Sequence, residues 1–346
     1  MIIPEKYGWK VICNKPLGSG GQGSVYLVTH VDMPDSKFAL KVLDQNATQE
    51  ARTRLRKEFS ALGKISNPNI IKIIEYPLPP NDEFLYYVME YHEGAKTIKE
   101  VCLDDPESNP YHGNALKCLD LFEQIINAIR ACEATFEPEN SIIHRDISPR
   151  NILVLPDGSI RLIDFGLCYT EGDETITMTG ENVGTRSYAP PECGAFSRFQ
   201  VGTHTDIFSA AKVLWSVITS KRVFDSHSIE DHTSMRSMFP RNEDTWHLNQ
   251  VFYSIIKPDP NDRNKSTEHI LLAIERARYA LVKGFPPLEA VESRCPSCGN
   301  RGVRAAEFGR QTFGGHMSQP YFAHECEICG FVFARNTETL KKSLKR

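Results

Sequence analysis

The stretch His144-Arg145-Asp146-Ile147-Ser148-Pro149-Arg150-Asn151 is followed at once by the apolar run Ile152-Leu153-Val154, and the triplet Asp164-Phe165-Gly166 closes a second apolar run. Asp146 and Asn151 stand five residues apart in a predicted tight loop, and Asp164 follows Asp146 by 18 residues. Three oxygen donors on adjacent loops suit a magnesium ion and the phosphates that it binds. A polar loop and a turn without function would not produce both patterns in this order.

A glycine-rich stretch lies upstream, at Leu17-Gly18-Ser19-Gly20-Gly21-Gln22-Gly23-Ser24-Val25. Its G-x-G-x-x-G spacing lets a backbone hairpin close over phosphate groups. The same spacing also marks dinucleotide-binding folds, in which a helix follows the glycines. Here the residues that follow are typical of a strand, and this favours the phosphate-covering hairpin.

A lysine, Lys41, closes the apolar strand that contains Ala39 and Leu40. Such a lysine can simply extend its ammonium group to solvent. A functional role requires a carboxylate on a nearby helix, and Glu58 supplies one 17 residues later in a charged helical stretch. The pattern therefore predicts an ion pair between Lys41 and Glu58.

Together these motifs resemble those of the eukaryotic-like serine/threonine protein kinase family, over about residues 9–280. The resemblance implies a two-lobed α+β fold, with a β-rich N-terminal lobe over residues 1–92 and a helical C-terminal lobe over residues 93–285. It implies Mg²⁺-dependent transfer of the γ-phosphoryl group of ATP to serine or threonine hydroxyls of protein substrates. It also implies that Asp146 is the base for the substrate hydroxyl and that Asn151 and Asp164 bind Mg²⁺.

By the same resemblance, ATP lies in the cleft between the two lobes. Lys41 holds its α- and β-phosphates, and Met89-Glu90-Tyr91-His92 resembles the hinge, with Met89 as gatekeeper and backbone groups of Glu90 and His92 facing adenine. The implied nucleotide-contacting residues are Gly18, Gly20, Gly23, Val25, Ala39, Lys41, Glu58, Met89, Glu90, His92, Asn151 and Asp164.

Later landmarks of the family are also matched. The stretch from Gly184 to Glu192 resembles the end of the activation loop, although it closes with Pro-Pro-Glu where the family usually has Ala-Pro-Glu. The resemblance implies that Asp206 braces the catalytic loop and that Arg263 pairs with Glu192.

Phosphorylation of the activation loop is a further expectation. Arg145 directly precedes Asp146, and the loop between Asp164 and Glu192 carries Thr175, Thr177 and Thr179. A phosphate on one of these threonines can pair with the guanidinium group of Arg145 and order the loop. The alternative is that the threonines are merely exposed to solvent.

One departure from the family bears on substrate class. Serine/threonine kinases usually carry a lysine two residues after the catalytic aspartate, where this chain has Ser148. Arg150, four residues after Asp146, stands where many tyrosine kinases keep their cation, and it is the predicted substitute for the lysine. Thr185 favours a serine/threonine kinase. The choice between serine/threonine and tyrosine as the substrate residue stays open.

Two C-x-x-C-G stretches lie in residues 286–346, at Cys295/Cys298 and Cys326/Cys329. Four thiolates at this spacing predict a structural Zn²⁺ site in a small zinc-ribbon-like module. The stretches VRAAEFGRQTF and QPYFAHE between them are typical of strands. A redox pair is the alternative, and His316 and His324 are possible replacement ligands.

Charge is spread unevenly along the 346 residues. Residues 293–346 hold nine basic and four acidic side chains, whereas residues 1–292 carry a net charge of −9. A basic, aromatic-rich terminal module can dock a protein or a nucleic acid, although such aromatics are often just the core of a small module.

The N-terminal residues lack the pattern of a secretory signal, and no apolar run approaches the ~20 residues that span a bilayer. Six scattered cysteines show no disulfide framework, so we expect a cytoplasmic protein without a membrane partner.

Two other functions fit parts of the pattern. A pseudokinase scaffold is disfavoured because Lys41, Asp146, Asn151 and Asp164 are all present. A small-molecule phosphotransferase of the aminoglycoside-kinase kind shares an H-x-D loop but generally lacks the full glycine loop and the activation segment. The oligomeric state is left open.

Overall fold

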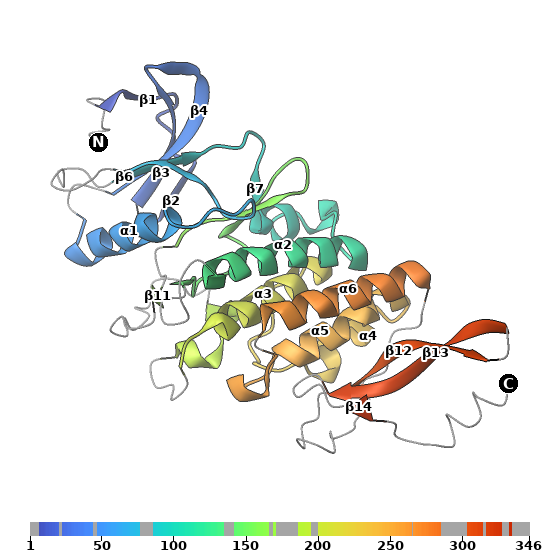
Figure 1. Ribbon diagram of the computed structural model, residues 1–346. Helices are drawn as coiled ribbons and strands as arrows, with labels where there is room; N and C mark the ends of the chain where they lie inside the picture. Colours follow the sequence, from blue (N-terminus) through green and yellow to red (C-terminus); the bar gives the residue numbers. More distant parts are fainter. Residues whose placement is uncertain are drawn as a thin grey trace. The chain divides into compact units, whose positions relative to one another are not determined.

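The computed structural model in Figure 1 describes most of the chain. The described residues are 7–20, 23–43, 47–76, 86–134, 142–165, 169–170, 186–194, 200–264, 266–284, 303–313, 316–326 and 332–333. They divide into two compact units. The first comprises Met1–His112 and Lys117–Asp225, and the second comprises Gly113–Leu116 and Ser226–Arg346. The predicted division into residues 1–92, 93–285 and 286–346 stays a prediction.

The first unit opens with a six-stranded antiparallel sheet in the order β1-β3-β4-β6-β5, with β2 paired to β3. This sheet is the predicted β-rich N-terminal lobe. Its strands are β1 (Trp9–Val11), β2 (Gly18–Gly20), β3 (Gly23–His30), β4 (Met33–Val42), β5 (Ile73–Glu75) and β6 (Tyr86–Glu90).

The register of the central strands sorts the side chains between two faces of the sheet. Lys41 lies opposite Val25 on β3 and opposite Tyr87 on β6, and Ala39 lies opposite Met89. Because side chains alternate along a strand, all five residues belong to one face. The other face forms a buried apolar cluster, whose members are Trp9, Tyr26, Val28, Leu40, Val42, Tyr86 and Val88.

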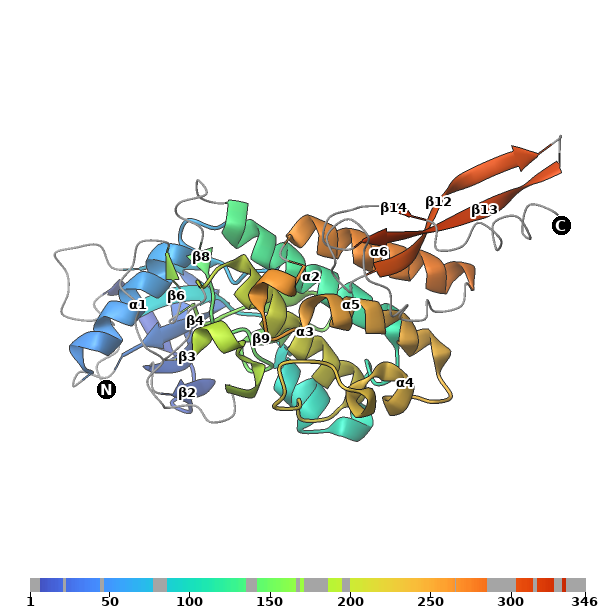
Figure 2. The same cartoon turned by 90° about the horizontal axis from the view of Figure 1, so that it is seen from below.

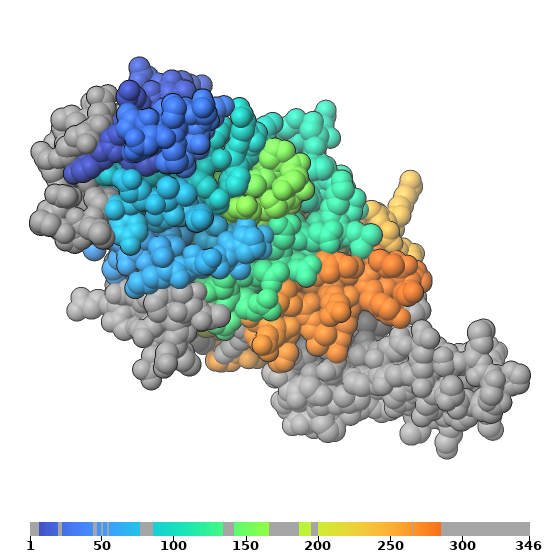
Figure 3. Space-filling model, turned by 45° about the horizontal axis from the view of Figure 1, so that its top comes forward, coloured from blue at the N-terminus to red at the C-terminus, as the bar shows by residue number. Residues whose placement is uncertain are grey.

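Helix α1 (Gln49–Leu62) lies against the face that carries Lys41 (Figures 1 and 2). The helix begins where the side chain of Thr48 accepts a hydrogen bond from the Ala51 N–H, which caps its first turn. Leu55, Glu58 and Leu62 recur at helical spacing and are all buried, so a carboxylate occupies an apolar stripe. In the space-filling view of Figure 3, the blue atoms of the sheet and the lighter blue atoms of α1 form one continuous surface.

The remainder of the first unit is built on two long helices and short strands. Its elements are β7 (Lys96–Thr97), the π-helical turn η2 (Lys99–Leu103), η3 (Pro106–Ser108), α2 (Ala115–Ala134), β8 (Ile142–Ile143), β9 (Ile152–Val154), β10 (Ile160–Leu162), β11 (Tyr169–Thr170), η5 (Arg186–Tyr188), η6 (Pro191–Cys193) and α3 (Thr203–Thr219). The three-stranded sheet β10-β9-β7 and the strand pair β11-β8 flank the loops that hold Asp146 and Asp164.

The apolar residues that recur at helical spacing along α2 are buried, except the first. Leu119, Phe122, Ile126 and Ile129 are buried, whereas Leu116 is 41% exposed. Leu116 lies in the first turn of α2. Helical periodicity alone does not tell how far along the helix the packed interface extends.

Among its described residues, the second unit contains three α-helices, three short 3₁₀ helices and a small antiparallel sheet. Its elements are η7 (Asp231–Thr233), α4 (Met235–Met238), η8 (Glu243–His247), α5 (Leu248–Ile255), η9 (Pro260–Asp262), α6 (Thr267–Lys283), β12 (Val303–Phe313), β13 (His316–Cys326) and β14 (Val332–Phe333). The two strand-like stretches predicted between the cysteine pairs form the hairpin β12–β13, and β14 adds a third strand. Among the described residues, no helix has the length and apolar character needed to cross a membrane.

Candidate functional site

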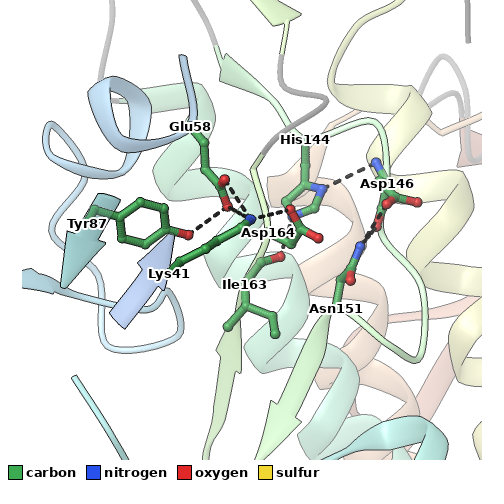
Figure 4. A network of polar contacts seen from close by, with 8 residues as sticks. All are labelled: Lys41, Glu58, Tyr87, His144, Asp146, Asn151, Ile163 and Asp164. Carbon is green, nitrogen blue, oxygen red and sulfur yellow. Dashed lines mark hydrogen bonds and ion pairs between the residues drawn. The ribbon is translucent and has the colours of Figure 1, made fainter. Parts of the chain in front are cut away.

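The ammonium group of Lys41 joins two carboxylates that come from different parts of the first unit (Figure 4). Its Nζ donates to both oxygens of Glu58, at 2.9 and 2.7 Å, and to Oδ1 of Asp164 at 3.1 Å. The structure therefore brings together three residues that the sequence separates by up to 123 positions. A β-strand, a helix and a loop each supply one of them.

Burial sets the electrostatics of this cluster. Burial alone would lower the pKa of Lys41, but the charges of Asp164 and Glu58 outweigh it and hold the lysine pKa above its ordinary value. Burial raises the pKa of Glu58, and the hydrogen bonds from Lys41 and Tyr87 act against that rise. Lys41 is therefore a fixed positive charge between two carboxylates.

A second cluster forms within the loop from Asp146 to Asn151. The amide Nδ2 of Asn151 donates to the carboxylate of Asp146 at 2.9 Å and to its carbonyl oxygen at 2.8 Å. The N–H of Asn151 also donates to the Ser148 carbonyl oxygen at 3.0 Å, which closes the turn. Burial, followed by the charge of Asp164, raises the pKa of Asp146 to about 7.

His144 connects the two clusters as a neutral imidazole. Its Nε2 lies 3.0 Å from the carbonyl oxygen of Ile163, and its Nδ1 accepts from the Asp146 N–H at 3.3 Å. An imidazole that accepts at Nδ1 and faces a carbonyl with Nε2 is the neutral Nε2–H tautomer. Burial agrees with this assignment, because it lowers the pKa of His144 to about 4.

The predicted bracing of the loop by Asp206 is confirmed. Its two carboxylate oxygens accept from the N–H groups of His144 and Arg145, at 2.7 and 2.9 Å. Arg145 has φ 64° and Asp164 has φ 65°, a region that L-residues rarely adopt. Strained backbone at these two motif positions is typical of functional sites, where surrounding contacts maintain it.

The predicted glycine-rich hairpin is present as the pair β2–β3, in which Gly20 lies opposite Gly23. Gly23 has φ 113°, and a Cβ added there would come within 2.5 Å of the Val42 carbonyl oxygen. The chain therefore requires glycine at this position to let β3 run beside β4. Gly21 and Gln22, at the tip of the hairpin, lie outside the described residues.

The predicted hinge, residues 89–92, begins within β6. Met89 is buried on the Lys41 face of the sheet, opposite Ala39. The carboxylate of Glu90 accepts from Nε of Arg161 at 3.1 Å and from the Lys72 N–H at 3.2 Å, and Nε2 of His92 lies 3.2 Å from it. The Glu90 N–H also donates to the Lys72 carbonyl oxygen at 3.0 Å, so the side chain and the N–H of Glu90 are both engaged within the protein.

The donor set of the site suits a magnesium ion. Asp164 offers a carboxylate and Asn151 an amide oxygen, both hard ligands of the kind that Mg²⁺ prefers. Because Asn151 uses Nδ2 toward Asp146, its amide oxygen is the end turned away from that residue. Within the described part of the chain, no group of three or more His, Cys, Asp and Glu side chains forms a metal site.

Several predicted site residues lie outside the described residues or have undescribed side chains. Cys295, Cys298 and Cys329 lie outside, and only the backbone of Cys326 is described, at the end of β13. Gly166, Thr185 and the three activation-loop threonines also lie outside. Arg263, the predicted partner of Glu192, belongs to the second unit, and their pairing stays a prediction.

Two functional contacts escaped the sequence reasoning. Tyr87 donates its hydroxyl to Oε1 of Glu58 at 2.8 Å, and Lys212 is wholly buried in α3. The available signal for Tyr87 is its place two residues before Met89, the predicted gatekeeper, on the same strand face. Lys212 stands within an apolar helix sequence, where a charged residue that is not at the surface needs partners.

Comparison with known proteins identifies the family of the chain. The family model described as "Protein kinase domain" matches residues 12–273. The chain is 32% identical to serine/threonine-protein kinase PrkC of Bacillus subtilis over 66% of its own length and 33% of that protein. It is 28% identical to serine/threonine-protein kinase PknH of Mycobacterium tuberculosis, over 65% of its own length and 34% of that protein. The chain thus spans about a third of the length of these curated relatives.

A solved structure resembles the fold as well. A crystal structure of the PknI kinase domain of Mycobacterium tuberculosis, in a mutant form, superposes with a TM-score of 0.57 at 22% sequence identity. The match covers 78% of this chain and 95% of that one.

Proposed function

The chain belongs to the protein kinase domain family, and on that premise we propose that it is an ATP-dependent serine/threonine protein kinase. The observation that carries the proposal is the assembly of Lys41, Glu58 and Asp164 beside the hydrogen-bonded pair Asp146–Asn151. The serine/threonine kinases among its relatives support the substrate class.

The chemistry assigned to these residues is that of phosphoryl transfer. Asp146 accepts the proton of a substrate hydroxyl as its oxygen bonds to the γ-phosphorus of ATP, and the bond from that phosphorus to the β–γ bridging oxygen breaks to leave ADP. Lys41 holds the α- and β-phosphates, and oxygens of Asn151 and Asp164 hold Mg²⁺, which neutralises phosphate charge when bound. Rigid positioning is the main contribution of the protein.

The nucleotide is proposed to lie against the Lys41 face of the sheet. Val25, Ala39 and Met89 present apolar groups on that face, in register with Lys41. The backbone of Glu90 and His92 is proposed to pair with adenine, and the β2–β3 hairpin to cover the phosphates through Gly18 and Gly20.

Regulation by phosphorylation of Thr175, Thr177 or Thr179 is part of the proposal. Arg145 is the residue that would receive the phosphate, because it adjoins Asp146 and its backbone is held by Asp206. Mass spectrometry of the fully active enzyme should find phosphate on at least one of these threonines. Their absence from the phosphorylated sites would remove this part of the proposal.

The terminal module is proposed to hold one structural Zn²⁺ through Cys295, Cys298, Cys326 and Cys329. The hairpin β12–β13 supports this, because Val303 lies opposite Cys326 and the strands thus connect the regions of the two cysteine pairs. The basic residues of the module suit a docked protein or nucleic acid. Cytoplasmic location is proposed from the free thiols of Cys13, Cys102, Cys118, Cys132 and Cys193.

Incubation of the pure protein with labelled ATP, Mg²⁺ and a generic protein substrate tests the main proposal. Phosphate on serine or threonine of the substrate is the expected result. Label on tyrosine alone would revise the substrate class. Label on small molecules but on no protein would favour the phosphotransferase alternative, and ATP binding without transfer would favour a scaffold.

A further inference from the structure

We propose that the hydroxyl group of Tyr87 is a positioning group of the phosphoryl-transfer site, which holds the carboxylate of Glu58 in the orientation that keeps Lys41 in place. Tyr87 acts through Glu58 and does not touch the nucleotide. The inference rests on the proposed kinase function and deepens it, because it assigns a role to a residue that is not one of the site motifs.

The register of the sheet puts Tyr87 where this contact is possible. Tyr87 on β6 and Lys41 on β4 are directly opposite each other, so both side chains point to the face covered by α1. The ammonium group of Lys41 lies 5.8 Å from the centre of the Tyr87 ring, and the tyrosine hydroxyl reaches past it to Oε1 of Glu58 at 2.8 Å. Side chains from strands β4 and β6 thus both contact the carboxylate that Glu58 presents from helix α1.

Glu58 needs the Tyr87 hydroxyl as a donor because it shares Lys41 with a second carboxylate. Its ammonium group donates to Glu58 and also to Asp164. Glu58 is 0% exposed, so no water can replace a lost donor. Without the Tyr87 hydroxyl, Lys41 would be the one remaining donor to Glu58 among the described residues, and it could turn toward Asp164.

The same strand offers a matched control in Tyr86. Tyr86 and Tyr87 are both 1% exposed, and the Tyr86 hydroxyl donates to a carboxylate as well, Oε1 of Glu75, at 2.9 Å. Because the two residues are adjacent on β6, Tyr86 points to the opposite face, into the apolar cluster that contains Trp9. Loss of either hydroxyl removes one buried hydrogen bond to a carboxylate, but only Tyr87 faces the site.

Steady-state kinetics with ATP and a protein substrate tests the proposal on wild type, Tyr87→Phe and Tyr86→Phe. We expect Tyr87→Phe to lower kcat/KM for ATP about tenfold and Tyr86→Phe to change it less than about twofold. The KM for the protein substrate should stay unchanged in both variants. Both should lose a similar few degrees of melting temperature, which separates positioning from a general loss of stability.

A double-variant cycle identifies the residue through which Tyr87 acts. In a Glu58→Gln background, Tyr87→Phe should have almost no further effect on kcat/KM for ATP. The proposal is overturned if Tyr87→Phe keeps wild-type kinetics, if Tyr86→Phe loses as much activity, or if the two changes at positions 58 and 87 add independently. A wild-type protein that transfers no phosphate would overturn the kinase function itself. That outcome is distinct from the failure of the Tyr87 proposal, which requires an active wild type.

Discussion

The buried ammonium group of Lys212 donates to the carbonyl oxygen of Ser187 at 2.9 Å, across 25 residues of sequence. It also donates to the Phe224 carbonyl oxygen at 2.8 Å and lies 4.7 Å from the centre of the Phe224 ring. One turn later on α3, the hydroxyl of Ser216 lies 3.1 Å from that of Tyr188. Helix α3 therefore anchors the segment that leads into Glu192, and it does so with a charged group inside an apolar core.

Lys212 should make stability depend on pH in the alkaline range. Burial lowers the pKa of Lys212 from 10.5 to about 8, although the charge of Asp225 opposes this. Between these two values the unfolded chain binds more protons than the folded one, so the free energy of unfolding rises with pH. From pH 7.5 to pH 9.5 this group should add about 2 kcal/mol.

The measurement compares urea unfolding of wild type and Lys212→Met at both pH values. Methionine removes the titrating group while keeping an unbranched chain of similar length, so other titrations cancel in the difference. The advantage of wild type over the variant should grow at the higher pH. A difference that stays flat, or shrinks, would show that Lys212 titrates normally in the folded protein.

Asp146→Asn should lower turnover strongly without a loss of stability. Burial raises the pKa of Asp146 to about 7, so at neutral pH the folded protein holds a carboxylate whose ionisation is disfavoured. A neutral amide removes that penalty, while loss of the base should lower kcat by about 10² to 10⁴. Single-turnover kinetics and thermal unfolding measure the two effects. Unchanged kcat in a folded variant would contradict the role of Asp146.

Lys41→Met should behave differently, because it removes a cation from between two carboxylates. The carboxyl groups of Glu58 and Asp164 would lose the cation that they share. Removal of one member of a buried ion pair typically costs about 3–5 kcal/mol, so we expect lost activity together with much lower stability. Denaturant unfolding of Lys41→Met beside Asp146→Asn should separate the two variants clearly. Equal stability of both would mean that Lys41 contributes no net stabilisation.

The sequence predicted the parts of the site that are encoded by local spacing. Asp146, Asn151 and Asp164 stand in short motifs whose neighbours limit the loop geometry, and the pairing of Lys41 with Glu58 needed only a strand followed by a helix. Tyr87 could not be predicted in this way. Its role depends on the register of β6 against β4, which pairs residues 46 positions apart.

The other surprises have a similar origin. A lysine within a helix is normally expected at the surface, and the two carbonyl partners of Lys212 become visible only in three dimensions. Leu116 fits the helical spacing of the apolar face of α2, yet its side chain is 41% exposed. Periodicity predicts the direction of a face but not its extent.

Metal analysis of the full chain should find about one Zn²⁺ per molecule. Four thiolates bind zinc tightly enough that the module should unfold when the metal is removed, because binding and folding are coupled. A chelator should therefore expose four reactive thiols, while Cys295→Ser together with Cys298→Ser should lower the zinc content to near zero. Kinase activity of residues 1–285 should largely survive. A folded, metal-free module would contradict the zinc assignment.

The loop between Asp146 and Asn151 buries Ser148 and exposes Arg150, the two residues at which it departs from the usual serine/threonine kinase pattern. Ser148 is 2% exposed, and its hydroxyl has no hydrogen-bond partner among the described residues. Arg150 is exposed on the same loop. A serine hydroxyl carries no charge, so Ser148 cannot replace the lysine that the family usually has there.

Arg150→Ala should therefore lower kcat about tenfold with little change in KM for ATP, because a cation near the transferring phosphoryl group stabilises charge that develops in the transition state. Arg150→Lys should keep most of the activity, since it retains the charge at the same position. This conservative variant tests the charge without altering the buried position of Ser148. Lys96→Ala, which removes another exposed cation of the same unit, should leave both constants unchanged. If Arg150→Ala keeps the kcat of wild type, or lowers it no more than Lys96→Ala does, the cation at position 150 takes no part in catalysis.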